Sequence, residues 1–210
     1  MELQSLAQIE RATRFGRAEM SRLGAAVAFL VGVIIYAGIN HAGVPGGYML
    51  IAAAVIGAYM AMNIGANDVA NNVGPAVGSR ALTLTGAIII AGIFEAGGAL
   101  IAGGDVVSTI KGGIIDPTAI HSKDEFIWLM MGALLAAGVW LNIATASGAP
   151  VSTTHSIVGA IVGFAIAGIG MDAVNWGKIG QIAASWIVSP LLGGIVALLL
   201  MMSIRKFILN

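Results

Sequence analysis

Long apolar runs separated by short polar segments constrain the fold of this chain more than any other feature. A membrane-spanning helix needs about 17–25 predominantly apolar residues. Five runs reach that length, and the fifth of the six in chain order is shorter unless the polar residues before it also lie in the membrane. The six runs occupy residues 23–39, 48–64, 82–102, 127–146, 156–170 and 182–203.

The composition agrees with a lipid environment. Hydrophobic residues make up 58% of the chain and charged residues 10%, whereas a soluble domain is about 45–50% apolar and about 25% charged. A formal net charge of zero gives no indication of a nucleic-acid partner. The absence of cysteine excludes disulfides, zinc–thiolate sites and thiol nucleophiles. We therefore expect an all-α integral membrane protein with about six transmembrane segments.

The distribution of charge predicts the topology. Residues 1–22 are polar and are interpreted as a cytoplasmic segment, although a signal peptide is the alternative; residues 23–40 are interpreted as an accessory transmembrane helix. With six crossings, one side of the membrane holds seven basic residues and the other holds three. Positive residues favour the cytoplasmic side, so both termini are expected inside, in the cell membrane. The seven are Arg11, Arg14, Arg17, Arg22, Arg80, Arg205 and Lys206.

The remaining region, residues 48–204, contains five crossings and is interpreted as one transporter repeat. A second copy joined in series would be inserted upside down, because the number of crossings is odd. A long polar loop is expected over residues 103–126. Trp128, Trp176 and Trp186 lie near predicted membrane edges and are interpreted as interfacial anchors.

The first motif, residues 65–80, reads GANDVANNVGPAVGSR and joins two apolar runs. Its glycines and proline predict a broken or re-entrant helix, which at membrane depth must line a cavity or be buried in protein. Asn67, Asp68, Asn71 and Asn72 share one side of a helical turn. Their carboxylate and amide oxygens are suited to a cation such as Na⁺ at Asp68. A surface loop rich in ordinary turn-forming residues is the alternative.

The second motif, residues 147–156, reads SGAPVSTTHS. Gly148 and Pro150 are expected to end one helix, and Ser152 to cap the next. A helix N-terminus binds anions, and the hydroxyls of Ser152, Thr153 and Thr154 are expected to add donors that point the same way. Simple helix capping is the alternative. If an oxyanion binds here, a cation on Asp68 would remove its repulsion, and the two ions would bind together.

The segments GANDVANNVGPAVGSRALTLTGA and GAPVSTTHSIVGA resemble the two signature segments of the inorganic phosphate transporter family. The resemblance implies an ion-coupled permease built from two inverted repeats, of which this chain holds the N-terminal one. It also implies that Asn67, Asp68 and Asn71 are cation and phosphate ligands, and that Ser152, Thr153 and Thr154 bind phosphate.

Two further polar residues were weighed as functional groups. Glu95 lies within the run at 82–102, where a lone carboxylate is expected to relay a proton or to complete the cation site; a neutral, buried glutamate is the alternative. The resemblance favours a functional role for it. His155 lies beside Ser152 and Ser156, but no acid lies near it in sequence and no G-x-S-x-G is present, so a hydrolase is rejected. No enzyme activity is expected.

The predicted function is symport of inorganic phosphate with H⁺ or Na⁺, with no other cofactor. The alternatives are a permease for sulfate or another oxyanion, a non-transporting anion sensor or regulatory subunit, and a channel. A second repeat is expected to complete the transport unit. It would be a continuation of the chain, a partner chain, or an antiparallel copy in a homodimer.

Overall fold

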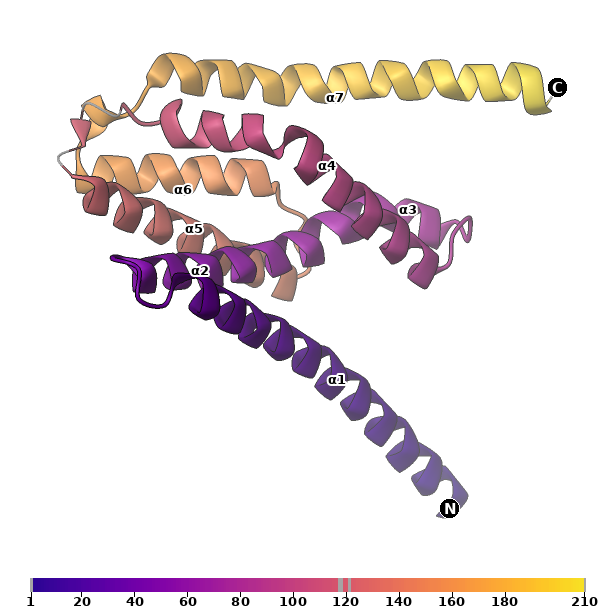
Figure 1. The fold of residues 1–210 in the computed structure, drawn as a ribbon. Helices are drawn as coiled ribbons and strands as arrows, with labels where there is room; N and C mark the ends of the chain where they lie inside the picture. Colours follow the sequence, from indigo (N-terminus) through magenta and orange to yellow (C-terminus); the bar gives the residue numbers. More distant parts are fainter. Residues whose placement is uncertain (1, 117–118, 121, 210) are drawn as a thin grey trace.

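Every predicted apolar run forms a helix in the computed structural model, which describes residues 2–116, 119–120 and 122–209 (Figure 1). The helices are α1 (Glu2–His41), α2 (Gly47–Ile64), α3 (Ala70–Gly78), α4 (Leu84–Gly112), α5 (Lys123–Ala146), α6 (Thr153–Gly168) and α7 (Trp176–Ile204). Short turns of other helix types are η1 (Gly65–Val69), η3 (Met171–Ala173) and η4 (Arg205–Leu209). Within the described ranges, the β structure is an isolated antiparallel bridge between Ile115 and Val174.

Among the described residues, five helical segments are long and apolar enough to cross a membrane. They are Glu19–His41, Gly47–Gly78, Leu84–Ser108, Lys123–Ala146 and Trp176–Ile208. Helix α6 is apolar but has 16 residues, which is short for a full crossing. The predicted all-α membrane fold is therefore confirmed, and so is the shortness of the run that follows the second motif.

Helix α1 is continuous across the predicted junction between the polar segment 1–22 and the accessory helix 23–40. A tight turn then folds α2 back against α1 (Figure 1). Gly46 has a φ of 76° in this turn, and Gly47 lies against the backbone carbonyl of His41, where a Cβ has no room.

The first motif differs from the expected break. The chain stays helical from Gly47 to Gly78, and at Gly65–Val69 it widens into a π-helix. Pro75 lies inside α3 without ending it. Helix termination comes after Gly78, where Arg80 adopts a φ of 62°. A π-helical turn inside an α-helix is frequent at functional sites, and this one contains Asn67 and Asp68.

The second motif does break the helix, as predicted. Gly148 turns the chain with a φ of 70°. Ser152 then caps α6, because its hydroxyl oxygen accepts a hydrogen bond from the backbone N–H of His155 at 3.3 Å. Helices α5 and α6 consequently form an antiparallel hairpin (Figure 1).

Small residues on α5 let its neighbours approach closely. Gly132 lies against the ring of Phe164 on α6, and Gly138 lies against the ring of Tyr59 on α2. The main apolar cluster lies between α5, α6 and the segments around Ile114 and Val174, which join the helix ends. The hairpin and α2 thus form the packed centre of the chain.

Helices α4 and α7 lie at the periphery (Figure 1). The apolar window of α7 has no buried residues, whereas a third of the α5 window, 33%, is buried. Helix α4 continues to Gly112, so the expected loop over residues 103–126 was too long. Its polar residues Asp105 and Ser108 lie on the last turns of that helix rather than in a loop.

Candidate functional site

The two motifs meet in space, although they lie about eighty residues apart in the chain. The hydroxyl of Thr153 donates a hydrogen bond to Oδ2 of Asp68 at 2.7 Å. The amide of Asn67 donates to the carbonyl oxygen of Ala149 at 3.3 Å, and its Oδ1 accepts from the backbone N–H of Val151 at 3.3 Å. The π-helical turn is therefore joined to the interhelical break by side-chain and backbone hydrogen bonds.

Asn67 is the centre of this junction. Its side chain is buried, with 6% of the residue exposed. It also donates to Oγ1 of Thr145 on α5 at 3.2 Å, and Nδ2 of Asn71 donates to its Oδ1 at 3.2 Å. Asn67 and Asn71 line a cavity of about 330 Å³ together with Thr145 and Pro150. Asn71 is hydrogen-bonded to Asn67, as expected of residues that share one side of a helical turn, and both Asn71 and Asn72 are exposed.

The three hydroxyls at the start of α6 do not point the same way, contrary to our expectation. Thr153 faces Asp68, whereas Ser152 and Thr154 line a cavity of about 640 Å³ between α4, α6 and α7. Successive residues on a helix project in different directions, so adjacent hydroxyls serve different neighbours. The site thus has a carboxylate side at Asp68 and a hydroxyl-lined side at this second cavity.

An amide pair beside the junction joins a buried residue of α2 to an exposed one of α5. Asn63 is 5% exposed, donates to the carbonyl of Tyr59 at 2.8 Å and accepts from Nδ2 of Asn142 at 3.1 Å. The sequence analysis did not single out Asn63. Asn63 precedes Asn67 by four residues, and that spacing was the available signal.

Glu95 is separate from the junction in this structure. It lies on an exposed part of α4, and no hydrogen bond or ion pair joins it to Asp68 or to any other described residue. The described part of the chain therefore does not bring Glu95 into the cation site that we expected it to complete.

His155 and Trp186 form a stacked pair in the wall of the second cavity. Their ring centroids are 3.6 Å apart and the rings are inclined by 30°. Trp186 lies inside α7, and its expected place at a membrane edge stays a prediction. Ser152 accepts from the backbone of His155 and not from its imidazole, so the described contacts contain no Ser–His nucleophile pair.

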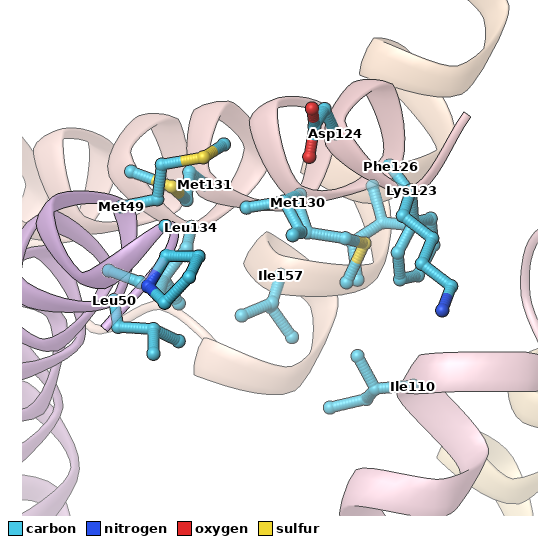
Figure 2. Close-up of a pocket in the computed structure, with 15 residues that line it drawn as sticks. Met49, Leu50, Ile110, Lys123, Asp124, Phe126, Met130, Met131, Leu134 and Ile157 are labelled. Atoms are coloured by element: carbon cyan, nitrogen blue, oxygen red, sulfur yellow. The ribbon is translucent and has the colours of Figure 1, made fainter. Parts of the chain in front are cut away.

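A third cavity lies between α2, α5, α6 and the end of α4, with a volume of about 630 Å³ (Figure 2). Its walls are apolar side chains such as Met49, Met131 and Ile157, and Lys123 and Asp124 stand at one end. The two charged side chains point to different sides (Figure 2). This cavity lacks the clustered donors that an oxyanion needs, so it is not the candidate site.

The family model of the phosphate transporter family matches residues 64–210, which include both motifs and every candidate ligand. The chain belongs to the phosphate transporter family. A family of transporters also confirms that the chain is not an enzyme and that it is a multi-pass membrane protein.

Relatives across bacteria and archaea agree with this membership. The chain is 49% identical over 208 residues to a Helicobacter pylori protein named "Putative phosphate permease", covering 99% of this chain and 39% of that protein. It is 46% identical over 161 residues to a protein of the same description from Pyrococcus abyssi, covering 77% of this chain and 40% of that protein.

A solved structure shares the fold as well. The chain is similar to a structure described as the sodium-dependent phosphate transporter, with a TM-score of 0.71, 43% sequence identity and coverage of 76% of this chain and 40% of that one. The chain therefore spans about two fifths of the length of the relatives it matches.

Proposed function

We propose that this chain forms part of a cation-coupled phosphate permease, with the junction of the two motifs as its transport site. The observation that carries the proposal is the hydrogen bond from Thr153 to Asp68, at 2.7 Å. It joins the candidate cation ligand directly to the candidate phosphate-binding stretch. Membership of the phosphate transporter family supports phosphate as the substrate.

The coupling follows from the chemistry of that contact. Asp68, with no cation bound, repels an oxyanion and holds the hydroxyl hydrogen of Thr153. A cation bound to Asp68 would neutralise the repulsion and compete for the same carboxylate oxygen. The Thr153 hydroxyl would then be released to donate to phosphate, so each ion would raise the affinity of the other.

The cation is proposed to be Na⁺, held by oxygens of Asp68, Asn67 and Asn71. Carboxylate and amide oxygens gather at this point, and the solved relative is described as sodium-dependent. Proton coupling is the second candidate, since a carboxylate can also carry a proton. Ser152 and Thr154 would complete the phosphate site from the start of α6.

The complete transport unit is proposed to lie in the cell membrane, with both termini of this chain cytoplasmic and a second repeat facing the first. The cavities at the two motifs support a second half, because polar side chains and freed backbone groups at membrane depth have to be enclosed by protein. Glu95 could join the site only in that assembly, since it lies apart from Asp68 in this chain.

Uptake of labelled phosphate into liposomes that contain the full-length protein tests the proposal. A sodium gradient should drive accumulation, and Asp68→Asn should abolish it while the protein stays folded and inserted. Asp172→Asn, in the exposed turn η3, is the matched control and should transport normally. Normal accumulation of phosphate by the Asp68→Asn variant would contradict the assignment of Asp68 as the cation ligand. Equal inhibition by sulfate would favour the general oxyanion permease, and binding without uptake would favour a sensor.

A further inference from the structure

Trp186 lies on the wall of the second cavity opposite Ser152 and Thr154. Its indole Nε1 is buried and has no hydrogen-bond partner among the described residues. Buried donors in native proteins are nearly always paired, and leaving one unpaired is unfavourable. An unpaired N–H beside a hydroxyl-lined cavity therefore indicates a ligand that supplies the acceptor.

Polar residues next to Trp186 interrupt the otherwise apolar span of α7. Ser185 and Ser189 line the same cavity, and Pro190 follows directly. Proline has no N–H, so it cannot donate to the carbonyl of Trp186 four residues earlier. Such freed backbone groups are tolerated at membrane depth where they line a cavity. Pro190 is thus a second observation, independent of the indole, that marks this part of α7 as a cavity wall.

The geometry of the stack holds the indole at the cavity. His155, in the first turn of α6, stacks on Trp186 at a centroid distance of 3.6 Å. Trp186 is only partly buried as a residue, and terminal torsions of aromatic side chains are broad. Because Nε1 is buried, donation to a ligand in the cavity requires the indole to rotate, and the broad terminal torsion permits that rotation.

We infer that Trp186 is a further oxyanion-binding residue, whose indole N–H donates to phosphate from α7 while Ser152 and Thr154 hold it from α6. The inference rests on the proposed function and adds a ligand from a helix that neither motif contains. Asp105 of α4 also lines the cavity. Its carboxylate repels a fully deprotonated anion but accepts a hydrogen bond from a protonated phosphate oxygen, so phosphate with at least one P–OH is the form that fits.

Binding of radiolabelled phosphate to the purified full-length protein in detergent, with sodium present, tests the inference. Trp186→Phe removes the N–H and keeps an aromatic ring for the stack with His155. Phosphate affinity should fall by about ten- to a hundredfold. The melting temperature without phosphate should fall by no more than the lost packing of the smaller ring explains, because an unpaired buried donor contributes no stability. The stabilisation of the protein by added phosphate should shrink accordingly.

Trp176→Phe is the matched control. Its indole donates to the carbonyl of Met171 at 3.2 Å, away from the cavity, so this variant should bind phosphate as the unmodified protein does. Unchanged phosphate affinity in Trp186→Phe overturns the inference and leaves the proposed function standing. If the unmodified protein does not bind phosphate, the proposed function fails, and the inference fails with it.

Discussion

At the scale of single residues, neighbouring hydroxyls in one motif have different partners. Thr153 donates to Asp68, while Thr154 lines the cavity on the other side of α6. One residue along a helix changes the direction of the side chain by about 100°. Thr153 and Thr154 therefore have different surroundings, and in the proposed site Thr153 would link the two ions while Ser152 and Thr154 face the second cavity.

Thr153→Val should weaken the coupling between the two ions. The substitution keeps the shape of the side chain and removes its hydroxyl donor, so phosphate affinity in sodium should fall by roughly ten- to a hundredfold, and the dependence of that affinity on sodium should decrease. Isothermal calorimetry at several sodium concentrations measures both. Thr153→Ser keeps the donor and is the control. A Val variant that retains full sodium dependence would contradict the coupling role.

Asn63→Ala should lower stability, because it removes the hydrogen bond between Asn63 and Asn142. Asn63 joins α2 to Asn142 of α5 at 3.1 Å, and hydrogen bonds between membrane helices contribute about 0.6–1.7 kcal/mol. Thermal unfolding in detergent should show a loss of that order. Asn40→Ala is the control, because Asn40 is exposed and bonds only to the carbonyl of Tyr36 in its own helix. An equal effect in both variants would argue against the pair.

At the scale of elements, the hairpin of α5 and α6 positions the site. The break between the helices places Ala149 and Val151 against Asn67 by backbone hydrogen bonds. Gly148 makes that break possible with a φ of 70°. An L-residue adopts this conformation at a cost of roughly 1–2 kcal/mol.

Gly148→Ala should therefore destabilise the hairpin by roughly 1–2 kcal/mol and weaken sodium-dependent phosphate binding, because the backbone that holds Asn67 would shift. Gly163→Ala is the matched control, since Gly163 lies in the middle of α6 with open space around its Cα and should tolerate a methyl group. Melting curves and binding titrations on both variants check the prediction. It fails if the two alanine variants behave alike.

At the scale of the whole molecule, the chain has a packed centre and long helices whose apolar side chains are not covered by protein. The apolar window of α7 contains no buried residue, and those of α1 and α4 are 6% buried. Lipid can cover apolar side chains, but the polar cavities at the motifs need protein around them. We propose that a second repeat provides the protein that encloses these cavities.

Residues 1–210 produced alone should therefore not accumulate phosphate in liposomes, whereas co-production with a second repeat should restore uptake. Cross-linking and native mass measurement would report whether the isolated chain pairs with another copy. Full-length protein reconstituted at the same density is the control. A strictly monomeric 210-residue chain that transports phosphate would show the two-repeat unit to be wrong.

The sequence by itself determined the class of this protein and most of its elements. Long apolar runs with almost no charge are stable in a membrane as helices, so the all-α fold followed from local composition. The spacing of Asn67 and Asn71 and the cap at Ser152 also followed, because both depend on residues within one helical turn. These local sequence patterns predicted only features that lie within the segment carrying the pattern.

Only the tertiary structure decided how those segments meet. The contact between Thr153 and Asp68 joins residues 85 positions apart, and no local pattern specifies which hydroxyl of the motif makes it. The π-helical turn replaces the expected break at Gly65, since packing against α5 and the hydrogen bonds of Asn67 hold that segment helical. Trp186 stacks on His155 of another helix in the wall of the second cavity, and no local pattern specifies that contact. Each of these features depends on the packing of distant helices, which composition and periodicity do not encode.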